Sequence, residues 1–212
     1  MKKITPLIAV TVILLAGCST STYITGSWKS PSPPSAAYNS LLIAAMTKNT
    51  VVRSTLENDM ADAIGSGVQT LKSINEFPPD FNGADSNKQV MLDNMKNRNV
   101  RGILVISILK KENDSRYIGP EPYTPMGYVY YNNFWSYYSY WYPTVYDPNY
   151  YTPDKVYYME TNLYDTQSEK LIWSAQSKTY TPDNLIPFSK EFAQVITGKL
   201  RTDGLLPPKA AK

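Results

Sequence analysis

The sequence predicts an α+β domain built on a mixed sheet of about five strands, with helices packed mainly on one face. Apolar runs of strand length, such as Ser40–Met46 and Arg101–Leu109, alternate with segments whose apolar residues recur at helical spacing. Two alternating segments, 155–164 and 170–180, are separated by a polar turn, which is typical of an antiparallel hairpin. The predicted order over residues 40–206 is β-α-β-α-β-β-β-α.

The first half of this domain contains local signals for two helices. Asn49 follows the first strand and is a favourable helix N-cap, and Gly65 is placed to end that helix. A second strand is expected at 68–73. Ser86 and Gln89 then have the spacing of a capping box, which predicts a second helix before the third strand.

The second half begins with Arg101–Leu109, which is apolar on both alternating faces. A strand of this kind is expected in the interior of a sheet, because both of its faces are buried. After the hairpin, a last helix is predicted from about Asp183 to Arg201, because apolar residues form one stripe along it. Gly204 is placed to end this helix.

The N-terminus has the organisation of an export signal. Lys2 and Lys3 precede an apolar run that ends in Leu15-Ala16-Gly17-Cys18. The run has about 12 residues, whereas a membrane span needs about 20. The tetrapeptide resembles the lipobox of bacterial lipoproteins, which implies that residues 1–17 are a cleaved signal peptide and that Cys18 carries lipid. Serine at position 19, where aspartate retains such proteins in the inner membrane, implies the outer membrane, facing the periplasm; the inner membrane or a Gram-positive cell membrane is the alternative.

Two terminal segments are expected to lie outside the folded domain. Residues 18–39 are rich in serine, threonine and proline, which predicts a lipidated N-terminus followed by a flexible tether. Residues 207–212 are predicted to be a disordered tail.

The domain resembles the N-terminal domain of TolB and the periplasmic domain of CsgG, within a group of bacterial envelope lipoproteins. The residues that carry the resemblance are Trp28-Lys29, Leu41 to Ala44, Arg53, Glu57, Gly67-Val68, Gly102 to Val105, Tyr164-Asp165, Lys170 to Ser174 and Gly204 to Leu206. The resemblance implies a non-catalytic role as an interaction or assembly module, and CsgG-like domains form rings.

The feature that departs from this resemblance is an aromatic insertion at 117–154, between the third and fourth strands. Fourteen of the 18 tyrosines lie between Tyr117 and Tyr158. Tyrosine and tryptophan are enriched at interfaces, so an exposed surface for a protein partner is one hypothesis. Glycan stacking and local packing over the sheet are two others, and contact with the membrane interface is a minor fourth. The candidate contact residues are Tyr131, Phe134, Trp135, Tyr138, Tyr140 and Trp141.

The composition argues against most catalytic chemistry. The chain has no histidine, and its one cysteine is the predicted lipid-attachment site, so the usual general base, thiolate nucleophile and zinc ligands are missing. No cofactor or metal site is predicted. A carboxylate pair remains conceivable from Asp147, Asp154, Glu160 or Asp165, because glycosidases need only two carboxyl groups. No basic run is long enough to follow a phosphate backbone, so nucleic acid is not an expected partner.

These observations together predict a non-enzymatic, membrane-anchored envelope lipoprotein that acts as an interaction or assembly module. Its expected partners are the membrane, through the lipid, and an envelope protein. Two alternatives stay open: a peptidoglycan-binding protein or weak glycan hydrolase that uses the aromatic insertion, and a subunit of an envelope oligomer.

Overall fold

The computed structural model describes residues 22–77, 85–112, 133–145, 156–180 and 185–209. Their centre is a six-stranded sheet with the order β1-β6-β5-β4-β2-β3. The strands are β1 (Thr22–Lys29), β2 (Ser40–Met46), β3 (Gln69–Lys72), β4 (Gly102–Glu112), β5 (Val156–Asp165) and β6 (Leu171–Tyr180). The strand β2 runs parallel to β3 and β4, and the other pairings are antiparallel. The predicted α+β class and the interior position of β4 are confirmed.

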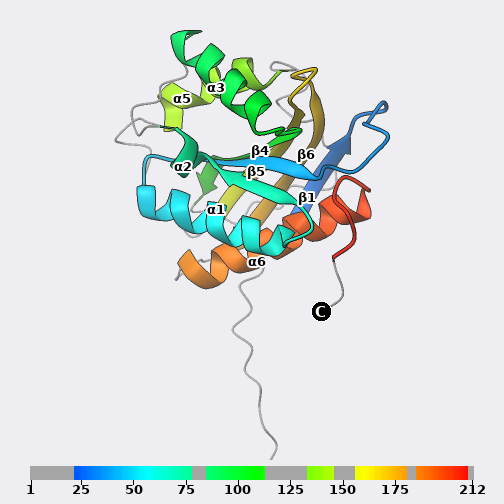
Figure 1. The fold of residues 1–212 in the computed structure, drawn as a ribbon. Coiled ribbons are helices and arrows are strands. Elements are labelled where there is room, and N and C mark those ends of the chain that lie inside the picture. The colour runs from blue at the N-terminus through cyan, green and yellow to red at the C-terminus, as the bar shows by residue number, and fades with distance from the viewer. Residues whose placement is uncertain (1–21, 78–84, 113–132, 146–155, 181–184, 210–212) are drawn as a thin grey trace, which may run out of the picture.

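Helices cover both faces of the sheet (Figure 1). The long helices α1 (Thr50–Ile64) and α6 (Leu185–Thr202) lie on one face, and α3 (Asp85–Asn97) and α5 (Phe134–Val145) lie on the other. A single-turn helix, α2 (Ser73–Glu76), follows β3 at the sheet edge. The sequence predicts helices mainly on one face, and the structure differs because α3 and α5, the latter inside the aromatic insertion, cover the second face.

Each face has its own hydrophobic core. On the α1 and α6 side, Met60, Trp173, Phe192 and Ile196 are fully buried, and each large apolar side chain buried in this way contributes roughly 1.5–3 kcal/mol. On the opposite side, Leu42 and Val105 of the sheet pack in one cluster with Met91 and Met95 of α3 and the aromatic side chains of α5. Consecutive residues of β5, Leu163 and Tyr164, belong to different cores, as strand alternation requires.

The local signals at the ends of α1 are confirmed. The Asn49 side-chain oxygen accepts hydrogen bonds from the amides of Val51 and Val52, both at 3.1 Å. Gly65 ends the helix with φ of 81°, a backbone conformation that favours glycine. The β5–β6 hairpin is also confirmed, and Asp165 closes its turn by accepting the amide hydrogen bond of Ser168 at 2.8 Å.

The N-terminal segment differs from its prediction as a tether. Residues 18–39 include β1, which pairs with β6 so that Thr22 lies opposite Thr179 and Lys29 opposite Trp173. Ile24 packs against the first core and Trp28 against the second, so the strand is held by both faces. At the other terminus, part of the predicted tail is also tied down, because Arg201 Nε donates a hydrogen bond to the Pro207 carbonyl at 3.3 Å.

Candidate functional site: an aromatic helix over a buried carboxylate

The helix α5 is positioned by the β5–β6 hairpin turn. The Asn133 side-chain oxygen accepts a hydrogen bond from the Ser136 amide at 2.9 Å, which makes Asn133 the N-cap of α5. The Phe134 amide donates to the Glu169 carbonyl in the turn at 3.3 Å, and Asn133 forms an isolated β-bridge with Lys170. The start of α5 is therefore fixed to one end of the sheet.

The structure buries most of the candidate contact residues. Tyr131 lies outside the described residues, and Tyr140 is 46% exposed. The buried candidates, with exposed fractions of 2% to 8%, are Phe134, Trp135, Tyr138 and Trp141. Their rings meet at edges and tilted angles, for example Phe134 and Trp135 at 5.2 Å between centroids, a favourable aromatic arrangement. The four buried candidates form local core, and Tyr140 is the described candidate that reaches the surface.

Below α5 lies a buried polar cluster that the sequence does not reveal. Tyr137 and Glu160 are both fully buried, and the Tyr137 hydroxyl donates a hydrogen bond to Glu160 Oε2 at 3.0 Å. Asn162 Nδ2 donates to the same oxygen at 3.1 Å. Burial, together with the neighbouring Glu160 carboxylate, raises the pKa of the Tyr137 hydroxyl well above its ordinary value of 10.0. The phenol therefore stays a neutral donor that holds α5 on the sheet.

This arrangement does not supply a carboxylate pair. Glu160 and Asp165 are five positions apart on β5, which corresponds to about 17 Å along a strand, whereas glycosidase carboxyl groups lie about 5–9.5 Å apart. Asp147 and Asp154 lie outside the described residues. Across the described ranges, no group of three histidine, cysteine, aspartate or glutamate side chains is placed to hold a metal ion.

A second buried carboxylate, Glu57, joins three elements. It accepts hydrogen bonds from the Ala45 amide at 3.0 Å, the Ser73 hydroxyl at 2.6 Å and the Ile74 amide at 3.0 Å. Arg53 lies one helical turn away and pairs with it at 3.3 Å. A buried charge needs such a set of donors, so this cluster ties α1 to β2 and α2 and has a structural explanation.

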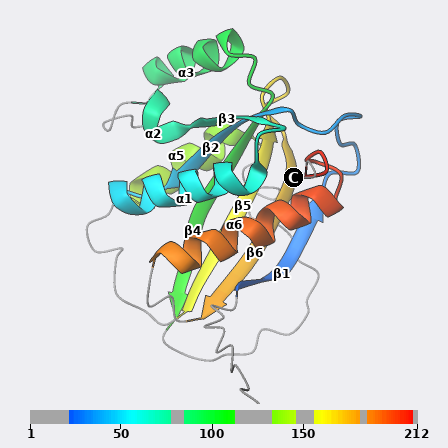
Figure 2. The same ribbon diagram turned by 60° about the horizontal axis from the view of Figure 1, so that its bottom comes forward.

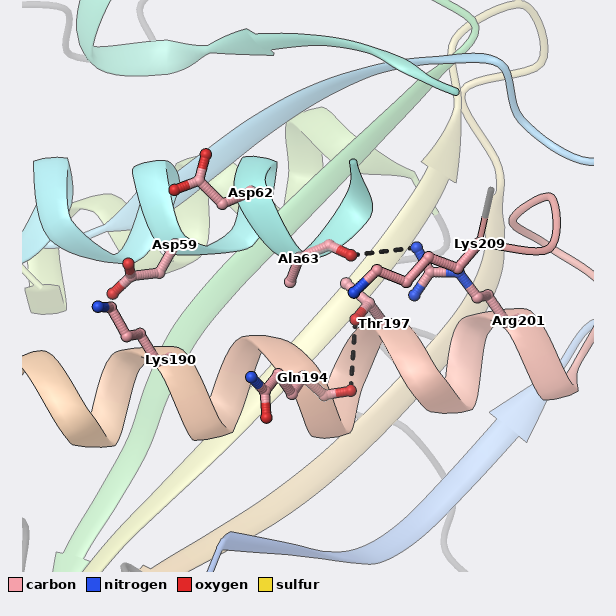
Figure 3. Close-up of a pocket in the computed structure, with 8 residues that line it drawn as sticks. All are labelled: Asp59, Asp62, Ala63, Lys190, Gln194, Thr197, Arg201 and Lys209. Carbon is pink, nitrogen blue, oxygen red and sulfur yellow. Dashed lines mark hydrogen bonds between the residues drawn. The ribbon is translucent and has the colours of Figure 1, made fainter. Parts of the chain in front are cut away.

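A polar groove of about 340 Å³ separates α1 from α6 (Figure 3). Its lining residues are Asp59, Asp62, Ala63, Lys190, Gln194, Thr197, Arg201 and Lys209. Arg201 Nη2 donates hydrogen bonds to the carbonyls of Ala63 at 3.1 Å and Ile64 at 2.8 Å, and so caps the C-terminal end of α1. The groove contains side chains of both charges, and the Arg201 guanidinium is already hydrogen-bonded to the protein's own backbone.

The predicted anchor, Cys18, lies outside the described residues, four positions before the first residue of β1. Among the helices described in the structure, none has the length and apolar character needed to cross a bilayer.

Comparisons with known proteins give structural likeness alone. No protein-family model matches the sequence, and no curated protein matches it. The fold is similar to a PelC dodecamer subunit from Paraburkholderia phytofirmans, with a TM-score of 0.42 and 12% identity over 88% of this chain and 99% of that chain. It is also similar to lipoprotein GNA1162 from Neisseria meningitidis, with a TM-score of 0.37 and 10% identity over 77% of this chain and 98% of that one. The resemblance to TolB and CsgG domains stays a prediction.

Proposed function

We propose that the protein is a non-enzymatic lipoprotein of the bacterial envelope, attached through Cys18 to the outer membrane and facing the periplasm, where it acts as an interaction or assembly module. The observation that carries this proposal is Leu15-Ala16-Gly17-Cys18 directly after a basic and then apolar N-terminus. Several acyl chains on one cysteine hold a protein far more firmly than a single chain. Anchoring raises the effective concentration at the membrane, so weak contacts can be occupied.

A non-enzymatic role is supported by how the buried polar groups are used. Glu57, on α1, accepts hydrogen bonds from β2 and α2, and Glu160 accepts them from α5 and β5. Both carboxylates have a structural role, because their oxygens accept hydrogen bonds from donors of the chain itself. The sequence also has no histidine, the side chain that most often serves as a general acid or base.

For the partner, the exposed phenol of Tyr140 favours a protein contact. Its ring packs edge-on against Trp141, with 5.5 Å between centroids and an interplanar angle of 86°. A ring held in this way loses little conformational entropy on binding. Trp135 and Trp141 are only 7% and 6% exposed, so they present no open indole face for stacking on a sugar. The surface of α5 therefore supports a protein partner better than a glycan.

The anchor is tested by metabolic labelling with a palmitate analogue. Label is expected in the wild-type protein and not in Cys18→Ala, and the variant should leave the membrane fraction. Absence of label in the wild type, or unchanged processing and fractionation of Cys18→Ala, would contradict the proposal.

The partner contact is tested with a photoreactive amino acid in living cells. Placed at Tyr140, the probe is expected to form adducts with an envelope protein, while the same probe at the buried Tyr138 serves as the matched control. A peptidoglycan adduct would favour the glycan-binding alternative, and no adduct from Tyr140 would contradict a contact through α5. Deletion of α5 cannot serve here, because its side chains form part of the second core.

A further inference from the structure

We infer that the domain is held in one orientation on the membrane, with the end of the sheet at which β1 begins facing the lipid surface. The opposite end, which carries the β5–β6 turn, points away from it. This inference rests on the proposed lipid anchor at Cys18, and it assigns a membrane-facing surface to the folded domain.

The first step is the length of the connection. Only three residues separate Cys18 from Thr22, the first residue of β1. Four Cα-to-Cα steps can span at most about 14 Å. A tether that ran to residue 39 would let the domain turn freely, whereas this short one holds Thr22 close to the headgroups. The far end of β1, at Lys29, is then about 23 Å further along the strand.

The second step is the set of elements at the Thr22 end. Thr22 lies opposite Thr179, and the next residue of β6, Tyr180, lies opposite Val156 of β5. Val156 in turn lies opposite Glu112, the last residue of β4. Figure 2 shows the arrowheads of β4 and β6 at the end where β1 starts. The start of β1, the end of β6, the start of β5 and the end of β4 therefore lie side by side along one edge of the antiparallel part of the sheet.

The helix α6 begins at this end as well. The Thr22 amide donates a hydrogen bond to Glu191 Oε1 at 3.0 Å, and the Phe188 ring lies 6.5 Å from that of Tyr157, near the start of β5. The first turns of α6 are therefore close to the start of β1, and the first of them carries Ile186, which is 56% exposed.

The third step is the chemistry of the two ends. Tyr23, the second residue of β1, is 42% exposed. Tyr23 and Ile186 are two of the five large hydrophobic residues that are exposed in the described part of the chain. Tyrosine is favoured at the level of the headgroups, and an exposed isoleucine can enter the interface. The opposite end has the polar turn Thr166–Glu169, in which Gln167 is exposed. Of the described residues, the exposed apolar side chains of Tyr23 and Ile186 therefore lie at the end that the short tether brings to the lipid, and the polar turn lies at the other.

Fluorescence quenching by spin-labelled lipid can test the orientation. The full lipidated chain is placed in vesicles of phosphatidylethanolamine with a minority of phosphatidylglycerol and a nitroxide lipid. Cys18 is the only cysteine and its sulfur is expected in a thioether, so Ile186→Cys or Gln167→Cys adds the one free thiol for a fluorophore. Gln167 lies in the turn before β6 and Ile186 in the first turn of α6 after it, and β6 itself is about 30 Å long. Quenching several-fold stronger at position 186 than at 167 is expected.

A lengthened connection supplies the matched control. Twelve glycine and serine residues inserted between Ser21 and Thr22 would span about 19 Å on average as a flexible chain. Vesicle flotation should stay the same, while quenching at position 186 falls to the level seen at 167. Circular dichroism of each labelled form checks that the fold is unchanged.

The outcomes separate the two proposals. If the wild-type chain does not float with the vesicles, the anchor is refuted and the orientation falls with it. If the chain floats but positions 186 and 167 are quenched equally, or 167 more strongly, the orientation alone is overturned. Unequal quenching that survives the insertion would show that the short tether is not its cause.

Discussion

At Gly102, the first residue of β4, neighbouring side chains lie very close to the backbone. A Cβ atom there would lie 2.7 Å from Leu41 Cδ2 and 2.9 Å from Tyr38 Cδ1. Both neighbours are buried, so neither can move away at low cost. We expect Gly102→Ala to lower the free energy of unfolding by about 1–3 kcal/mol, measured by urea denaturation at constant m-value.

The control for this prediction is Gly198, which lies within α6 with no atom in reach of an added Cβ. There, alanine gains helix propensity, so Gly198→Ala should raise the free energy of unfolding by about 0.5–1 kcal/mol. The steric explanation would be refuted if Gly102→Ala were neutral, or if both variants shifted stability in the same direction.

Tyr137 permits a prediction about alkaline pH. Tyr137→Phe removes a donor from the buried Glu160 carboxylate, which should cost about 1–3 kcal/mol near neutral pH. In the wild type, the raised pKa keeps the folded phenol neutral above pH 10.0, while the unfolded tyrosine ionises. The wild type therefore loses up to about 1.4 kcal/mol per pH unit from this group above its unfolded pKa, and phenylalanine loses none.

The deficit of Tyr137→Phe relative to the wild type should accordingly shrink as the pH rises above about 10. Urea denaturation on both sides of that value measures it. Tyr38→Phe should follow the same trend, because burial and the neighbouring Asp165 raise the pKa of Tyr38. A deficit that stays constant or grows with pH would show that these hydroxyls are not neutral in the folded protein.

Residues that act on their immediate neighbours are predictable from sequence, and those that act across the fold are not. Asn49 and Gly65 perform their capping roles within a few residues, so the chemistry of each side chain predicts its place. Tyr137 and Glu160 are 23 positions apart and meet only when α5 lies on β5. Spacing does indicate one part of that site, because Phe134, Tyr137 and Trp141 recur at helical intervals.

At the scale of elements, the question for β1 is whether residues 22–29 form a paired strand or a flexible tether. Amide hydrogen exchange over Thr22–Lys29 should be slow, because this strand is paired with β6 along its length and packs on both cores. Mass spectrometry of peptides from this range measures the protection. The exposed residues Ser35 and Ala36 supply an internal comparison, because the prolines at 31, 33 and 34 have no amide hydrogen. Exchange over 22–29 as fast as that of an unstructured peptide would restore the tether and remove the basis of a fixed orientation.

The same two elements, β1 and α5, show why composition misleads. β1 contains serine, threonine and glycine, and its register shifts between Ile24 and Gly26, which weakens the alternation. Aromatic residues have only moderate helix propensity, so the α5 sequence does not favour a helix by itself. Both elements are stabilised by what they bury, and this information lies in the rest of the chain.

At the scale of the molecule, one sheet carries two cores. The sequence predicts the core on the α1 and α6 side, because the helices there have regular apolar stripes. The second core is built on α3 and on the aromatic residues of α5. The sequence alone does not decide whether those aromatic residues form an interface or pack on the sheet. Most of the described aromatic side chains of the insertion are buried in this core, and Tyr140 is the one that is exposed for contact.

Two cores that share one sheet should unfold together. Leu163 and Tyr164 are neighbours on β5 yet pack in opposite cores, so loss of one core disturbs the strand that supports the other. Phe192→Ala removes a fully buried ring from the first core and should cost about 3–5 kcal/mol, a hundredfold or more in the unfolding equilibrium. Hydrogen exchange should then accelerate by the same factor in α6 and in α5, on the opposite face. If α5 keeps its wild-type protection while α6 loses its own, the two faces unfold independently, and α5 can open to a partner without loss of the anchored domain.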